Sequence, residues 1–292
     1  MARSDCPTCG GSGWKVVERT TEGARAVSAD QPGGSSSSES KMVWAVPCEC
    51  TVVNRSERVF GRARIPERYR HCDFESFDTD LYEQGAAKTW NDSIKQAKLV
   101  VQRFADEYMP PTPEAGFEQG LLLMGPCGVG KTHLAVAALK QIFARGHSGL
   151  FYDYRELLKE IQGSYNPESQ PTEMSVLEPV LKAEVLVLDD VGSSKPSAWA
   201  LETIGHILNT RYNDRRVTFL TSNFLDADSA ANAARHGAHP GGAARAPAIE
   251  DTLSERVGTR IRSRLYEMCR TIEIVAPDYR KEIRNQSRFS RS

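Results

Sequence analysis

The sequence predicts an α/β domain in which a parallel β-sheet is covered by helices on both faces. Short apolar runs without alternation recur along the chain, and segments of helical periodicity separate them. Strands buried on both faces show such unbroken apolar runs, whereas apolar and polar residues alternate along a strand that has one solvated face. The glycine-rich segment 125–130 follows one of these runs and precedes a helix, which is the strand–loop–helix order of a phosphate-binding unit.

The expected elements follow in order along a domain that spans residues 75–292. A helix is expected over 82–108, because its pattern ends at Met109-Pro110-Pro111. The other predicted strands are at 121–124, 150–154, 185–188, 217–220 and 271–275. Further helices are expected at 131–144 and at 197–212, and a helical stretch that follows the strand 150–154 is expected to run through residue 161. Residues 227–248 contain ten Ala, three Gly and two Pro, which predicts a mobile surface insertion.

Composition restricts the class of protein. The 292 residues include 37 Lys and Arg against 38 Asp and Glu, so global charge does not indicate nucleic-acid binding. Residues 253–292 are locally basic, with ten Lys or Arg against five acidic side chains. No apolar run reaches the roughly 18 residues of a membrane span, and the N-terminus lacks a signal-peptide pattern. We therefore expect a soluble, cytoplasmic protein without membrane contact.

Residues 1–54 are expected to form a small zinc-binding module. Cys6-Pro-Thr-Cys9 and Cys48-Glu-Cys50 flank a Gly- and Ser-rich segment that is expected to be a flexible loop. Four thiolates in two close pairs suit tetrahedral Zn²⁺, and a region with so few apolar side chains needs such a staple. Because Cys-x-Cys is tighter than the usual spacing, His71 or Cys72 is an alternative for one ligand. Four reduced cysteines in an unstructured tail are the other alternative.

An Arg-rich connector over residues 55–74 joins this module to the α/β domain. Six arginines stand against two glutamates there. The positive charge that the composition as a whole does not show is therefore local.

The segment Gly125-Pro126-Cys127-Gly128-Val129-Gly130-Lys131-Thr132 fits the pattern G-x-x-x-x-G-K-[ST]. Its glycines allow backbone N–H groups to face phosphate oxygens, and the helix that follows adds its N-terminal dipole. Lys131 would reach the β- and γ-phosphates of ATP, and Thr132 would bind Mg²⁺. The next residue, His133, is expected to be an ordinary helix residue.

Polar side chains follow two of the predicted strands. Asp189 and Asp190 come directly after the run 185–188, where Asp189 is placed to hold Mg²⁺ and Asp190 to orient the water that attacks the γ-phosphate. Many ATPases have Glu where Asp190 stands, so the shorter carboxylate predicts slow hydrolysis. Asn223 follows the run 217–220 and is predicted to contact the γ-phosphate or the attacking water; a plain turn is the alternative.

The order of these motifs resembles the DnaC/DnaI-type replicative helicase loaders and their IstB relatives, which are AAA+ ATPases. The matching segments are Gly-Val-Gly-Lys-Thr-His-Leu-Ala, Leu-Asp-Asp-Val-Gly, Thr-Ser-Asn, Ile65-Pro-Glu-Arg-Tyr69, Asn209-Thr-Arg-Tyr212 and Arg262-Ser-Arg-Leu-Tyr-Glu-Met-Cys269. The resemblance covers roughly residues 60–282, with 227–248 unmatched, and implies an AAA+ P-loop fold. The cysteine module is similar to the zinc module of DnaI-like members, which docks onto the replicative helicase.

The resemblance also implies an active site shared between neighbouring subunits. A family arginine finger falls on Arg264, and Arg260, one helical turn away, is the alternative. Self-association through this interface is therefore expected. A sensor-2 arginine, which binds the nucleotide, falls on Arg280.

The expected function is ATP-dependent loading of a hexameric replicative DNA helicase onto single-stranded DNA, with ATP, Mg²⁺ and Zn²⁺ as cofactors. One alternative is an IstB-like transposition helper ATPase that binds duplex DNA and a transposase. The other is a nucleotide-dependent adaptor with negligible hydrolysis. The cysteine module favours the loader over the transposition helper.

Overall fold

The computed structural model describes residues 6–20, 41–48, 61–82, 87–110, 120–165, 172–226 and 252–281. The chain divides into two compact units, Met1–Gly61 and Arg62–Ser292. The division falls inside the Arg-rich segment 55–74. In the described part of the chain, no helix has the length and apolar character that crossing a lipid bilayer requires.

The N-terminal unit contains an antiparallel hairpin, which the sequence pattern does not predict. Strand β1 (Trp14–Thr20) pairs with strand β2 (Lys41–Pro47) along their full lengths. The backbone N–H of Cys48 donates to the carbonyl of Gly13 at 2.8 Å, which holds the end of β2 beside the turn that precedes β1. The hairpin therefore brings together two segments that are far apart in the sequence.

The second unit is built on a five-stranded parallel sheet, as the unbroken apolar runs predict. Its strands are β3 (Gly120–Met124), β4 (Gly149–Asp153), β5 (Val185–Asp189), β6 (Val217–Ser222) and β7 (Arg270–Glu273). They lie in the order β4-β5-β6-β3-β7, and every neighbouring pair is parallel. All residues of β3, β5 and β6 are buried, so the carboxyl ends of three central strands meet at one edge.

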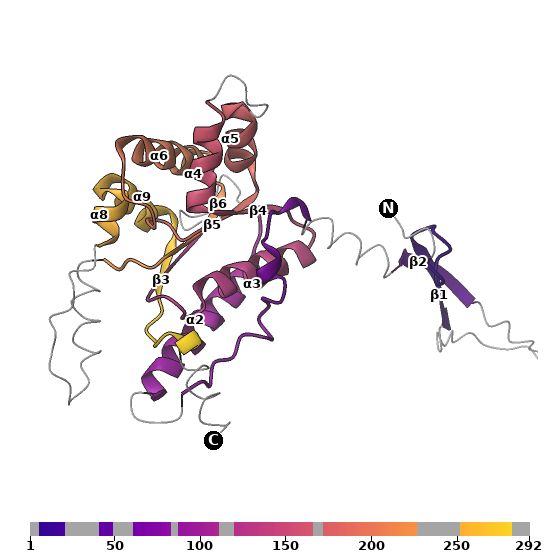
Figure 1. Cartoon of the computed structure of the whole chain (residues 1–292). Helices are drawn as coiled ribbons and strands as arrows, with labels where there is room; N and C mark the ends of the chain where they lie inside the picture. Colours follow the sequence, from indigo (N-terminus) through magenta and orange to yellow (C-terminus); the bar gives the residue numbers. More distant parts are fainter. Residues whose placement is uncertain are drawn as a thin grey trace, which may run out of the picture. The chain divides into compact units, whose positions relative to one another are not determined.

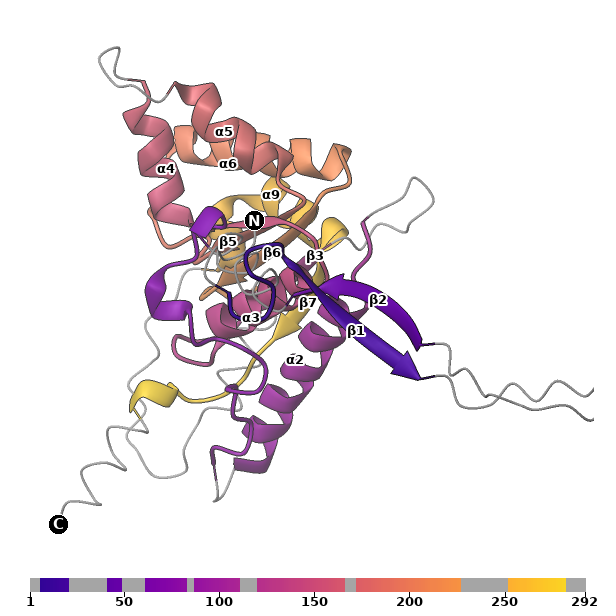
Figure 2. The ribbon, with the colours of Figure 1, turned by 90° about the vertical axis from the view of Figure 1, so that its right-hand side faces the viewer.

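Helices cover both faces of this sheet (Figures 1 and 2). One face carries α2 (Ala87–Glu107) and α3 (Lys131–Ala144), and the other carries α4 (Tyr154–Gly163), α5 (Glu173–Lys182), α6 (Ala198–Asn213), α8 (Leu253–Val257) and α9 (Thr259–Met268). On the first face Phe104 of α2 packs edge-on against Phe219 of β6, with ring centroids 5.4 Å apart. On the second face Leu188 and Leu220 of the sheet join the apolar sides of the helices in one core.

The five predicted strands and the helices 131–144 and 197–212 are confirmed, with ends that shift by at most two residues. The helix expected from residue 82 spans Ala87–Glu107, and residues 83–86 lie outside the described part. Helix α5 is not predicted by the pattern, and it carries an internal proline, Pro179. The insertion expected at 227–248 lies outside the described residues.

Arg211, which belongs to the motif Asn209–Tyr212, holds three elements of the second face together. Its guanidinium is fully buried and donates to the carbonyls of Val180 and Ala183 at the end of α5, at 2.8 and 2.9 Å. It also donates to Thr218 Oγ1 of β6 at 2.9 Å. Burial lowers the pKa of Arg211 to about 9, so the side chain keeps its charge at neutral pH. This motif residue therefore stabilises the fold and lies away from the phosphate loop.

Candidate functional site

The phosphate loop joins β3 to α3 at the carboxyl edge of the sheet. Gly125, Gly128 and Gly130 all have positive φ, and Gly130 is the N-cap of α3. A Cβ on Gly128 would lie 1.8 Å from Asp278 Oδ1, and one on Gly130 would lie 2.5 Å from the ring of Phe77. Glycine is therefore required at these positions by backbone conformation and by close packing. The cradle of backbone N–H groups at a helix N-terminus fits the phosphates of a nucleotide.

Lys131 lies at the first position of α3 and is only 6% exposed. Its ammonium donates to the carbonyls of Gly125 and Pro126 at 2.8 and 2.7 Å, which orients it toward the inside of the loop. Burial lowers the pKa of Lys131 to about 8, while the negative charges of nearby groups, including Asp190 and Asp189, oppose that change. The lysine is therefore charged at neutral pH and held where the sequence predicts a phosphate contact.

Asp189 lies at the end of β5 and brings together the two predicted magnesium ligands. Its Oδ1 accepts hydrogen bonds from Thr132 Oγ1 at 2.8 Å and from Thr221 Oγ1 at 2.6 Å. Burial raises the pKa of Asp189, and the hydrogen bonds from Thr221 and Thr132 partly offset that effect. A carboxylate and a hydroxyl at the foot of a phosphate loop form the oxygen donor set that Mg²⁺ prefers, so these residues fit that ion.

Asp190 is held at a strand end by contacts from three directions. Its backbone has φ of 60°, a conformation that non-glycine residues rarely adopt, and its N–H donates to Thr221 Oγ1 at 2.9 Å. The amide of Asn223 donates to Asp190 Oδ1 at 2.6 Å. The guanidinium of Arg155 lies 3.4 Å from Asp190 Oδ2. The carboxylate that the sequence assigns to water activation is therefore fixed in orientation.

Sequence reasoning missed three side chains of this site: Tyr69, Arg155 and Thr221. Tyr69 ends the short 3₁₀ helix η1 (Glu67–Tyr69), and burial, followed by the charge of Asp189, raises its pKa, whereas Arg68 and Thr132 lower it. These influences place Tyr69 close to Asp189 and Thr132. A signal was present, because each of the three lies within a family-like motif or close after a predicted strand.

A small cavity adjoins the outer side of the phosphate loop. It has a volume of about 90 Å³. Its lining combines the loop with the segment before α2 and the segment after β7, and consists of Ser76, Phe77, Asp78, Leu81, Tyr82, Ile94, Gly128, Val129, Gly130, His133 and Tyr279. The backbone N–H of Tyr279 donates to the Gly128 carbonyl at 3.3 Å. The segment before α2 and the segment after β7 therefore both contact the phosphate loop.

The arginines near the end of the unit differ in their surroundings. Arg264 lies partly buried on α9, with its guanidinium 4.2 Å from the centroid of the Tyr212 ring. Arg260, one turn earlier, is exposed and has no charged or aromatic partner among the described residues. Arg280 is exposed, and its charge contributes to the lowered pKa of Lys131, after burial. Arg280 is therefore near the loop, whereas the other two lie on the helix that packs beside α6.

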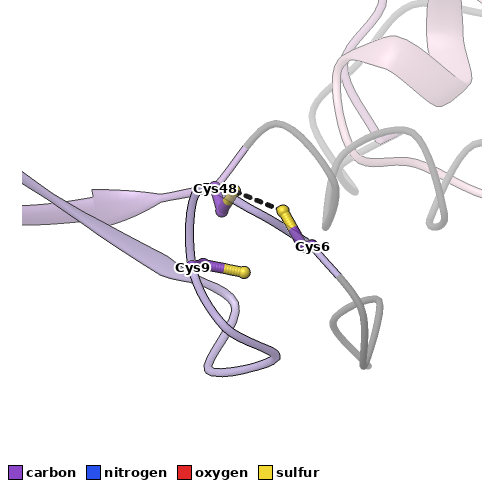
Figure 3. Close-up of side chains that lie close together, drawn as sticks. All are labelled: Cys6, Cys9 and Cys48. Carbon is purple, nitrogen blue, oxygen red and sulfur yellow. Dashed lines mark hydrogen bonds between the residues drawn. The ribbon is translucent and has the colours of Figure 1, made fainter.

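Three of the four predicted zinc ligands meet in the N-terminal unit. The side chains of Cys6, Cys9 and Cys48 point toward a common space (Figure 3), and their sulfur atoms lie within 4.8 Å of one another. The Sγ atoms of Cys6 and Cys48 are 3.7 Å apart. Two thiolates on a tetrahedral Zn²⁺ with bonds of about 2.3 Å are about 3.8 Å apart, so the arrangement fits that ion. Cys50 lies outside the described residues.

His71 and Cys72, the alternative zinc ligands, form a second group in the other unit. Together with His133 of α3 they place one ligand atom each within 4.8 Å of one another. His133 Nε2 lies 2.8 Å from the carbonyl oxygen of Asp73. The histidine that the sequence treats as an ordinary helix residue therefore takes part in a polar cluster.

A family model described as an IstB-like ATP binding protein matches residues 116–229. This range contains the phosphate loop, Asp189, Asp190 and Asn223. ATP is thus the nucleotide to which the matched family points.

Curated relatives carry the name replicative helicase loader. The DnaC protein of Buchnera aphidicola subsp. Schizaphis graminum is 27% identical over 169 residues, which cover 58% of this chain and 62% of that protein. The DnaI protein of Bacillus subtilis is 27% identical over 141 residues, which cover 48% of this chain and 44% of that protein. The chain therefore spans less than two thirds of the length of these relatives.

Solved structures agree with these matches. A crystal structure of the DnaC helicase loader is 30% identical and has a TM-score of 0.52, covering 72% of this chain and 99% of that chain. A crystal structure of DnaI is 26% identical with a TM-score of 0.51, covering 72% of this chain and 95% of that chain. The five-stranded parallel sheet with its phosphate loop is accordingly the AAA+ P-loop fold that the resemblance implies. The chain belongs to the DnaC/DnaI-type family of AAA+ proteins, and its own residues 116–229 match the IstB-like ATP binding protein model.

Proposed function

We propose that this chain binds ATP with Mg²⁺, hydrolyses it slowly, and loads a replicative DNA helicase onto single-stranded DNA. The observation that carries the proposal is the joining of Thr132 and Asp189 by a 2.8 Å hydrogen bond at the foot of a complete phosphate loop. The names of the DnaC and DnaI relatives support helicase loading as the purpose of this nucleotide site.

Each residue of the site has a role in this mechanism. The backbone N–H groups of 125–130 bind the phosphates, and the Lys131 ammonium neutralises charge at the β- and γ-phosphates. Thr132 and Asp189 hold Mg²⁺, which supplies Lewis-acid stabilisation of charge on the phosphate oxygens when bound. Arg280 approaches the phosphates from the segment after β7. The hydrogen bond from the backbone N–H of the adjacent Tyr279 to the Gly128 carbonyl supports this role.

Hydrolysis depends on Asp190 and Asn223. The Asp190 carboxylate accepts a hydrogen bond from the attacking water, and Asn223 fixes that carboxylate and contacts the γ-phosphate. Aspartate reaches one methylene less far than glutamate, and Arg155 draws one of its oxygens toward α4. Both features favour slow turnover, which suits a protein whose nucleotide state acts as a switch.

The nucleoside base occupies the cavity beside the loop. Apolar and aromatic side chains line it, Phe77 and Tyr279 among them, and it adjoins the phosphate-binding backbone at Gly128. A flat aromatic base next to the phosphates needs a lining of this kind.

An arginine of α9 completes the site of a neighbouring subunit. Arg264 is the residue that the resemblance selects, yet its guanidinium is engaged by the Tyr212 ring, which it would have to leave. Arg260 needs no such rearrangement, because it is exposed. The geometry therefore favours Arg260 as the finger and Arg264 as a residue that positions α9 against α6.

The N-terminal unit binds one structural Zn²⁺ and contacts the helicase. The converging thiols of Cys6, Cys9 and Cys48 support the metal, with Cys50 as the fourth ligand. Trp14 and Trp44 are 58% and 54% exposed on the hairpin. Exposed tryptophans are typical anchors in protein–protein interfaces, so they support a role in docking.

A transposition helper remains the second candidate, because the matching family model is described as IstB-like. A helper would bind duplex DNA together with a transposase, whereas a loader acts on a helicase and single-stranded DNA. An adaptor with negligible hydrolysis would bind ATP without turning it over. These three functions differ in measurable ways.

The test is a helicase-loading assay with the full chain. Single-stranded DNA coated with its binding protein carries a downstream duplex, and unwinding by the replicative helicase of the same organism is measured with ATP. We expect the wild-type chain to stimulate unwinding at least about tenfold, and Lys131→Ala to remove this effect because phosphate binding is lost. Lys159→Ala, which changes an exposed lysine of α4, is the matched control. Stimulation by Lys131→Ala equal to wild type would refute an ATP-dependent loader.

A further inference from the structure

Two histidines and a cysteine converge beside the nucleotide site and outside the N-terminal cysteine cluster. His71 and Cys72 follow η1, and His133 lies in the first turn of α3, directly after Lys131 and Thr132. One ligand atom from each residue lies within 4.8 Å of the other two. Cys72 Sγ and His71 Nε2 are 3.9 Å apart, and the two imidazole rings meet edge to face at 5.9 Å.

The chemistry of this cluster matches a borderline-soft metal ion. Imidazole nitrogen and thiolate sulfur are the donors that Zn²⁺ selects, and hard ions such as Mg²⁺ or Ca²⁺ prefer oxygen. Three protein ligands leave one tetrahedral position for water. The Cys72 side chain is 2% exposed and His71 is exposed, so the cluster reaches from the interior to the surface, where an ion can enter.

A neighbouring backbone group already orients one of the rings. A carbonyl oxygen can only accept, so His133 Nε2 donates to Asp73 O at 2.8 Å. That tautomer leaves the lone pair on Nδ1 available for a metal. Metal-bound histidines typically donate their other ring N–H to a carbonyl or a carboxylate in this way.

The cluster also connects two segments that contact the phosphate loop. The His133 ring packs edge-on against Phe77 at 5.1 Å, and Phe77 contacts Gly130 of the loop. Lys140 of α3 donates to the Arg70 carbonyl at 3.1 Å, which holds the segment before His71 on the same helix. An ion held by all three ligands would fasten residues 71–77 to the start of α3.

We propose that His71, Cys72 and His133 form a second metal site, which takes Zn²⁺ and ties the segment before α2 to the phosphate-loop helix. The site is separate from the cysteine cluster, because it uses two nitrogens and one sulfur from the other unit. It also does not depend on the proposed loader function, because the ligands themselves define it.

The test measures Zn²⁺ in the full chain after equilibration with excess metal and removal of the unbound ion. We expect about two Zn²⁺ per wild-type chain, about one in His71→Gln, in Cys72→Ser and in the double variant Cys6→Ser/Cys9→Ser, and about none when both sets are changed. His206→Gln, an exposed histidine of α6, is the matched control and should keep both ions. Thermal unfolding checks that each variant is folded, and His71→Gln changes an exposed side chain whose loss a folded chain should tolerate.

Co²⁺ provides an independent reading of the ligands. In Cys6→Ser/Cys9→Ser we expect one bound Co²⁺ with the weak sulfur-to-metal charge-transfer band of a single thiolate, and this band should vanish when Cys72→Ser is added to the same variant. In the Cys6→Ser/Cys9→Ser background, competition with a chromophoric chelator should show Zn²⁺ affinity at least about tenfold weaker when His71→Gln is added than when His206→Gln is added. Equal Zn²⁺ content and affinity in His71→Gln, Cys72→Ser and wild type would overturn the proposal, whatever the ATPase assays show.

Discussion

The side-chain amide of Asn223 donates to Asp190 Oδ1 at 2.6 Å. The two residues follow neighbouring strands, β5 and β6, whose carboxyl ends lie side by side in the sheet. Asp190 adopts a positive φ of 60° at this point of contact. The predicted water-activating carboxylate and the predicted γ-phosphate contact therefore form one unit.

Asn223→Ala should separate catalysis from binding. Removing the amide frees the Asp190 carboxylate, so we expect the hydrolysis rate to fall about 10²-fold while ATP affinity changes less than about threefold. Phosphate release and titration with a fluorescent ATP analogue measure the two quantities. Asn209→Ala, an exposed asparagine of α6, is the control and should leave both unchanged. Equal losses of affinity and rate would mean that Asn223 supports the pocket as a whole.

ATP affinity should weaken above pH 8. The pKa of Lys131 is lowered to about 8, chiefly by burial, so raising the pH to 9 removes the proton from most nucleotide-free chains. The phosphates need the ammonium form, and binding at pH 9 must therefore take up a proton; we expect affinity about tenfold weaker than at pH 7. The measurement is the dissociation constant of a non-hydrolysable ATP analogue between pH 7 and 9.

Lys131→Arg is the control for this pH dependence. Its guanidinium stays charged throughout the range, so affinity should be nearly constant with pH, even if it is weaker overall. The same slope in both proteins would show that another group titrates.

Mixing experiments should identify the arginine finger. Arg260→Ala should bind ATP normally, because its own pocket is intact, and lose about 10³-fold in hydrolysis. Mixed with Lys131→Ala, it should recover part of the activity, because one interface then pairs an intact pocket with an intact finger. Dilution should abolish the recovery, because it depends on assembly.

Arg264→Ala is tested in the same way. We expect it to lower the stability of the α9–α6 contact through loss of the Tyr212 ring interaction, without complementation by Lys131→Ala. If Arg264→Ala recovers activity when mixed with Lys131→Ala and Arg260→Ala does not, the finger is Arg264 instead.

Gly128→Ala should damage the nucleotide site. The added methyl group would lie 1.8 Å from Asp278 Oδ1, and φ of +81° disfavours any side chain. We expect ATP affinity to fall at least about tenfold and the free energy of unfolding to fall by about 1–3 kcal/mol. Gly163→Ala is the control, because nothing lies within 4 Å of the position that its methyl group would take and its φ is not positive. Unchanged affinity in Gly128→Ala would mean that the loop tolerates displacement of Asp278.

Much of the second unit could be predicted because its signals are local. The runs at β3, β5 and β6 are fully buried strands, and the loop motif fixes the start of α3 at Lys131. The location of Asp189 and Asn223 at one edge could be predicted because a parallel sheet gathers its strand ends there, while their roles stay predictions.

The remainder depends on contacts between distant residues. The Arg264–Tyr212 stacking joins two helices, and no spacing in the sequence reports it. Pro179 inside α5 argues against a helix by propensity, and packing of Val176, Leu177 and Val180 in the core overrides it. The N-terminal hairpin could not be predicted, because the polar, glycine-containing segment 21–40 separates its two strands.

The contacts of Phe77 with Gly130 and of Asp278 with Gly128 have a thermodynamic consequence. Phe77 belongs to the segment that precedes α2 in the sequence, and Asp278 belongs to the segment that follows β7. A ligand that displaces either segment, and with it the loop, changes the affinity for nucleotide when it binds. By linkage, the nucleotide changes the affinity for that ligand by the same factor. The loop glycines thus couple the phosphate site to the segments on either side of the sheet's strands in the second unit.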